Sequence, residues 1–164
     1  MIEELTKFFK GAKRVVIVGV GSELRGDDAA GLEVVRRLKR ILTSPRVMLV
    51  EGGAAPENFT TKIKRFNPTH IVFIDAADIG GEPGSVTLIA PERIVGSAFT
   101  HRLPLSFLAD YLKTQINARI LVIGIQPHHV DIGSEISGKV KKAIDVLADA
   151  LVKILSKKEC DGNG

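Results

Sequence analysis

A short apolar run followed by two glycines and two aspartates constrains the fold of this chain more than any other stretch. The run covers residues 15–18 (VVIV), and so continuous a β-branched sequence predicts a strand buried on both faces of a sheet. The glycines that follow predict a tight turn. Apolar residues then recur at intervals of three and four, which predicts a helix over about residues 29–42. Asp27 and Asp28 stand where that helix begins.

The alternation of strands and helices continues along the chain. Further strands are predicted at residues 47–50, 71–74, 85–90 and 118–125, the third of them more polar and therefore at an edge. Further helices are predicted at residues 2–10, 57–66, 104–116 and 134–155. We therefore predict an α/β fold, a three-layer α/β/α sandwich with a largely parallel five-stranded sheet. Residues 1–157 are expected to form one domain and residues 158–164 a flexible tail.

Composition excludes several classes of function. Hydrophobic residues make up 45% and charged residues 26% of 164 positions, as in a globular domain. The net charge of +4 is spread over interspersed acids and bases, and 5% aromatic residues leave little surface for base stacking, so no nucleic-acid partner is expected. No apolar run approaches the roughly 18 residues that span a membrane. The N-terminus lacks the apolar core of a secretion signal, so we expect a cytoplasmic protein.

Acidic residues follow three of the predicted strands. Asp27 and Asp28, Glu51 and Asp75 come after separate strands, and the carboxyl ends of parallel strands meet at one edge of the sheet. Carboxylates that close are unfavourable unless a cation or a shared proton neutralises them. His101, in the loop before a predicted helix, could add an imidazole. Two carboxylates and an imidazole suit nickel, zinc or iron better than magnesium or calcium.

Each of these residues also has a purely structural interpretation. Asp27 could cap the helix that follows it, which would leave Asp28 as the better candidate for chemistry. Asp75 could hydrogen-bond to the turn after its strand. Glu51 could accept loop N–H groups, and His101 could cap its helix or pack beneath the loop.

Three other histidines are weaker candidates. His128 and His129 follow the last strand and could be ligands, although a flexible pair after Gln126–Pro127 is more often exposed to solvent. His70 precedes its strand and therefore belongs to the opposite edge of the sheet. The only cysteine, Cys160, cannot form an internal disulfide and lies in the polar tail, so we expect no role for it.

A dinucleotide site is the obvious alternative, because Gly19 and Gly21 follow a strand and precede a helix. The fingerprint of such a site requires a third glycine, where this sequence has Leu24. Asp27 and Asp28 would also repel a pyrophosphate at the start of the helix. A nucleotide-binding regulatory module and a different metal-dependent hydrolase remain the competing interpretations.

Five segments in order carry a resemblance to a known family and together span about residues 15–133. They are VGVGSELRGDDAAG, EGGAAPEN, NPTHIVFIDAADIGGEPG, THRLPLSFLADYL and GIQPHHVDIG. The set resembles the nickel-iron hydrogenase maturation endopeptidases, most closely the HycI-type branch. The family often has asparagine where this chain has Ser22, and DDG or DEG where it has DDA.

The resemblance implies a protease that removes a C-terminal extension from a hydrogenase large-subunit precursor once nickel has been inserted. It also implies that Asp28, Asp75 and His101 contact the metal and act in cleavage. Nickel would then be carried by the precursor, the partner of this protein, and would serve in recognition as well as in possible catalysis. We expect the protein itself to be a monomer.

Overall fold

The computed structural model describes residues 1–94 and 105–161, with side chains described as far as residue 157. Its core is a five-stranded sheet with the order β2-β1-β3-β5-β4. The strands are β1 (Val15–Val20), β2 (Val47–Gly53), β3 (His70–Ala76), β4 (Val86–Ile89) and β5 (Arg119–Ile125). All neighbouring pairs are parallel except β4 and β5, which are antiparallel. The predicted largely parallel five-stranded sheet is therefore confirmed, with β4 at an edge.

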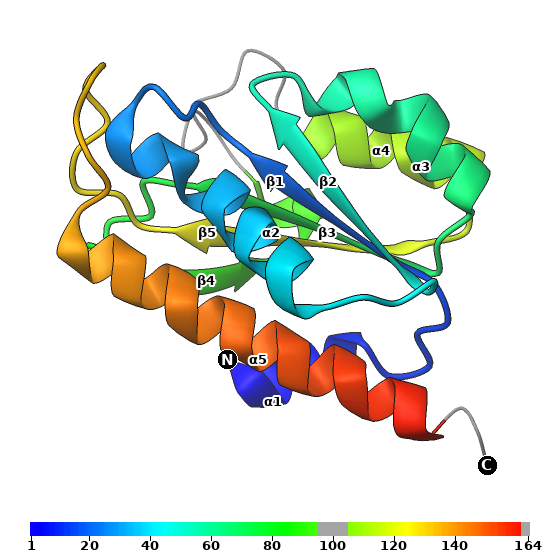
Figure 1. The fold of residues 1–164 in the computed structure, drawn as a ribbon. Coiled ribbons are helices and arrows are strands. Elements are labelled where there is room, and N and C mark those ends of the chain that lie inside the picture. The colour runs from blue at the N-terminus through cyan, green and yellow to red at the C-terminus, as the bar shows by residue number, and fades with distance from the viewer. Residues whose placement is uncertain (95–104, 162–164) are drawn as a thin grey trace.

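Helices cover both faces of the sheet (Figure 1). The helices are α1 (Ile2–Phe8), α2 (Ala30–Ile41), α3 (Thr60–Phe66), α4 (Leu105–Gln115) and α5 (Gly138–Asp161), and three short 3-10 turns are η1 (Gly26–Ala29), η2 (Pro56–Phe59) and η3 (Pro91–Arg93). One core joins α1, α2 and α5 to alternate residues of the sheet such as Ile17, Val72 and Ile123. The other core joins α3 and α4 to the intervening residues, such as Val16, Phe73 and Val122. Side chains of successive strand residues point to opposite faces of the sheet. Because helices cover both faces, every residue of β1 and β3 is buried.

The close approach of α2 to the sheet depends on two glycines. A Cβ on Gly31 would lie 2.0 Å from the carbonyl oxygen of Ile74 in β3. A Cβ on Gly19 in β1 would lie 2.4 Å from the carbonyl oxygen of Gly31. Only glycine fits at either position, and this contact fixes the start of α2 over the carboxyl ends of β1 and β3.

The last helix begins and ends later than its sequence pattern predicts. We expected residues 134–155, whereas α5 covers Gly138–Asp161. Residues 134–137 stay outside the helix because the backbone N–H and the hydroxyl of Ser137 both bind the Asp27 carboxylate. The predicted helix at 57–66 likewise divides into η2 and α3. None of the described helices combines the length and apolar character that crossing a membrane requires.

Candidate functional site

Two buried carboxylates lie at the carboxyl edge of the sheet. Asp28 comes from η1, which follows β1 after the loop at residues 21–25, and it is only 5% exposed. Asp75 is the penultimate residue of β3 and is fully buried. Because β1 and β3 are neighbours and η1 contacts β3, the two acids are brought together from segments 47 positions apart in the sequence.

The electrostatics of this pair favour a positive charge. Burial raises the pKa of the Asp75 carboxyl well above its usual range, and the nearby charge of Asp28 raises it further. A hydrogen bond from the backbone of Ala76 offsets only part of this effect. A cation beside the two oxygen donors would remove both penalties, since an opposite charge favours the ionised form.

The turn after β1 holds Asp28 in place. The backbone N–H of Ser22 donates to Oδ2 of Asp28 at 2.9 Å. Gly21 has a φ of 132°, and a Cβ on it would lie 1.8 Å from the carbonyl oxygen of Asp28. The glycine of this loop is therefore needed for the turn itself, which explains a motif that superficially resembles a dinucleotide fingerprint.

Asp27 serves a structural purpose, although not the predicted one. Neither η1 nor α2, both fully described, has a side-chain cap, so Asp27 does not cap the helix that follows it. Its fully buried carboxylate instead accepts hydrogen bonds from the backbone of His128, His129 and Ser137 at 2.7–2.9 Å and from the Ser137 hydroxyl at 2.5 Å. Burial opposes ionisation, but the Ser137 hydroxyl and the three N–H donors outweigh it and lower the pKa of Asp27.

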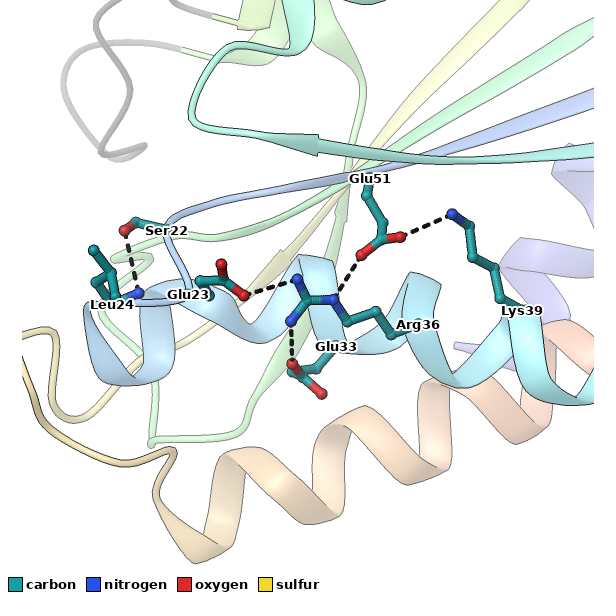
Figure 2. Close-up of polar contacts among 7 residues, drawn as sticks. All are labelled: Ser22, Glu23, Leu24, Glu33, Arg36, Lys39 and Glu51. Atoms are coloured by element: carbon teal, nitrogen blue, oxygen red, sulfur yellow. Dashed lines mark hydrogen bonds and ion pairs between the residues drawn. The ribbon is translucent and has the colours of Figure 1, made fainter.

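Glu51 does not join the carboxylate pair. Figure 2 shows its carboxylate between two cations of α2, with Arg36 Nε at 2.6 Å and Lys39 Nζ at 2.8 Å. Arg36 also binds Glu33 and Glu23, the second of which lies in the turn before η1. The Arg36 and Lys39 hydrogen bonds lower the pKa of Glu51, so this acid is neutralised by ion pairs and needs no metal.

The three histidines that the structure describes lie in two places. His101 lies outside the described residues. His128 and His129 are exposed, as predicted, and their rings stack with centroids 3.9 Å apart. His70 opens β3 at the opposite edge, as predicted, and its ring packs against Phe8 and Phe9. Over residues 1–94 and 105–157, no three acidic, histidine or cysteine side chains are grouped closely enough to hold a metal ion. The Asp28–Asp75 pair would therefore need a further ligand.

Sequence reasoning missed two residues that organise this edge. Ser137 anchors Asp27, and Gln126 accepts hydrogen bonds from Ile79 and Gly81 while its amide donates to Asp78. Gln126 thereby braces the loop that follows Asp75. A polar amide at the end of an apolar strand was a signal for Gln126, and a serine just before a helix was a signal for Ser137.

Comparison with known proteins gives matches in both sequence and fold. Residues 32–154 match the family model HycI, described as hydrogenase maturation protease. The chain is 31% identical over 140 residues to the hydrogenase 3 maturation protease of Escherichia coli K12, covering 83% of this chain and 87% of the relative. The crystal structure of a [NiFe] hydrogenase maturation protease HycI from Thermococcus kodakarensis superposes with a TM-score of 0.88 at 38% identity, over 93% of this chain and 99% of the other. The E. coli endopeptidase HybD shares the fold, with a TM-score of 0.76 at 20% identity.

Proposed function

Because this chain belongs to the hydrogenase maturation protease family, whose members are peptide-bond hydrolases, we propose that it removes the C-terminal extension of a nickel-iron hydrogenase large-subunit precursor. Cleavage follows nickel insertion, and the reaction takes place in the cytoplasm. The observation that carries the proposal is the burial of two carboxylates together at the carboxyl edge of the sheet.

In this proposal the nickel ion is part of the substrate. Asp28 and Asp75 supply oxygen ligands, and His101 supplies the nitrogen ligand that the described residues lack. Binding energy then depends on the metal, because an ion in the precursor relieves the repulsion between the two acids. A nickel-free precursor offers no such compensation, so the protease distinguishes loaded from empty substrate.

The same contact prepares the site for hydrolysis. The charge of the docked ion favours the ionised form of Asp75, since a neighbouring cation lowers the pKa of a carboxyl. A metal ion next to the scissile bond can polarise the carbonyl or activate a water molecule. One of the two carboxylates then takes the proton from that water as general base.

The dinucleotide-binding alternative has little physical support. A pyrophosphate would have to bind at the start of α2, where Asp27 and Asp28 are both buried at the preceding turn. Thermal melting in the presence of NAD, ATP, nickel or zinc separates the interpretations. Stabilisation by a nucleotide alone would favour the regulatory module.

The direct test is incubation with nickel-loaded and nickel-free precursor, followed by mass spectrometry of the products. We expect the wild-type protein to cleave the loaded form only, and the variants Asp28→Asn, Asp75→Asn and His101→Ala to lose activity. Asp110→Asn is the matched control, because Asp110 is an exposed acid on α4, outside the loops at the site edge. Unchanged cleavage by all three site variants would refute the assignment.

A further inference from the structure

Two loops at the site edge expose large apolar side chains to solvent. Leu24 is 69% exposed in the first rim loop (residues 21–25), which joins β1 to η1. Ile132 is 81% exposed in the second rim loop (residues 126–137), which joins β5 to α5. Among the large apolar side chains of the described residues, these two are the most exposed. Single exposed apolar side chains are common, whereas apolar side chains that lie together mark surfaces that bind another molecule.

Hydrogen bonds hold the two rim loops together as one unit. The backbone N–H of Gly133, next to Ile132, donates to the carbonyl oxygen of Leu24 at 2.8 Å. Arg25 Nε donates to the carbonyl oxygen of Val130 at 3.2 Å. The Asp27 carboxylate adds its four hydrogen bonds to the second loop. The backbone that carries the two apolar side chains is therefore held in place, which lowers the entropic cost of binding a partner.

The first rim loop is also continuous with the carboxylate pair. The Leu24 N–H donates to the Ser22 hydroxyl at 3.3 Å, and the Ser22 N–H donates to Asp28. Figure 2 shows Ser22 and Leu24 at the outer end of this turn, while Glu23 reaches back to Arg36 on α2. Ser22 therefore links the backbone of Leu24 to the Asp28 carboxylate through two hydrogen bonds.

We propose that Leu24 and Ile132 form a docking contact for an apolar segment of the hydrogenase precursor close to its scissile bond. This inference rests on the proposed function and identifies how the substrate protein is held. The metal contact recognises a charge, whereas the apolar contact recognises the protein that carries it. A second copy of this chain on the same contact would face the site edge and obstruct it, which favours the substrate as the occupant.

The test compares Leu24→Ser, Ile132→Ser and the double variant with Ile41→Ser. Ile41 is the matched control because it is 52% exposed at the C-terminal end of α2, away from the rim loops. With nickel-loaded precursor we expect the double variant to raise KM by about tenfold or more, from the lost burial of two apolar side chains. We expect kcat to change by less than about twofold, as for a contact made equally before and during the reaction. Ile41→Ser should leave both constants unchanged.

Direct binding of the precursor to immobilised wild-type and double-variant protein provides the second measurement. An unchanged KM together with unchanged binding would overturn the docking contact while leaving the proposed function intact. Binding that weakens in the double variant, without any cleavage by the wild-type protein, would refute the proposed function and support the contact. A wild-type dimer that the double variant converts to a monomer, with KM unaltered, would assign the contact to a second copy and overturn the inference. Absence of precursor binding to the wild-type protein would overturn both.

Discussion

The packing of Gly31 against the sheet gives the sharpest prediction. In Gly31→Ala the new Cβ would lie 2.0 Å from the carbonyl oxygen of Ile74 and 2.7 Å from that of Val20. Both are backbone atoms of strands, so neither can rotate away. To reach the roughly 3.3 Å of a close carbon–oxygen contact, the start of α2 must move outward by about 1.3 Å.

Two opposing contributions decide how much Gly31→Ala changes the free energy of unfolding. Alanine in a helix is favoured over glycine by about 0.5–1 kcal/mol. Overpacking of a well-packed contact costs typically about 1–3 kcal/mol. We therefore expect a net loss of about 1–2 kcal/mol in the free energy of unfolding. Because η1 precedes α2 directly, the same movement displaces Asp28 relative to Asp75, and a misplacement of about 1 Å lowers cleavage on the order of 100-fold.

Urea denaturation measures the first effect and precursor cleavage the second. Gly138→Ala is the matched control, because Gly138 opens α5 and a Cβ there meets no atom within 4 Å. That variant should gain about 0.4–1 kcal/mol, as an unstrained glycine-to-alanine change does. A Gly31→Ala protein that gains stability like Gly138→Ala, with wild-type cleavage, would refute the close-contact argument.

Three further predictions concern charged groups. Asp75→Asn should abolish cleavage yet raise the free energy of unfolding at pH 7 by about 0.5–2 kcal/mol. The pKa of Asp75 is raised in the folded protein, so ionisation of this carboxyl destabilises the fold above the usual carboxyl pKa. The gain in stability should therefore vanish near pH 3. Asp27→Asn should lower the free energy of unfolding at pH 7 by about 1–3 kcal/mol, because the new amide nitrogen faces N–H donors. The pKa of Asp27 is lowered in the folded protein, so this difference in stability should shrink as pH falls through the folded-state pKa. Urea titrations at several pH values measure it. Arg36→Met should lower the free energy of unfolding by about 1 kcal/mol at low salt and by less at 1 M salt, because salt screens these partly exposed ion pairs. An equal loss at both salt concentrations would contradict this.

Much of the fold could be predicted from local patterns of apolar residues in the sequence. The continuous apolar runs of β1 and β3 predict central strands because both faces of those strands are buried, and the more polar residues 85–90 predict an edge. Helix boundaries were less predictable where tertiary contacts decide them. Ser137 stays outside α5 because it binds a residue 110 positions earlier, and no local pattern carries that information.

The candidate site, too, could be predicted only in part from the sequence. Asp28 and Asp75 were expected at one edge because parallel strands deliver their carboxyl ends together, and the structure brings the two close enough for their charges to interact. Glu51 also lies at the end of a parallel strand, but Arg36 and Lys39 bind its carboxylate. The strand pattern does not specify that these two cations of α2 face Glu51. The role predicted for His101 remains a prediction.

The hydrogen bonds between Asp27 and Ser137 also limit how early during synthesis this edge of the sheet can be completed. More than a hundred further residues must be synthesised after Asp27 before its carboxylate can bind these partners, so the edge that carries Asp28 is completed only after β5 has been synthesised. A nascent chain that ends before residue 128 therefore contains Asp28 and Asp75 but lacks the hydrogen bonds that Asp27 makes at this edge.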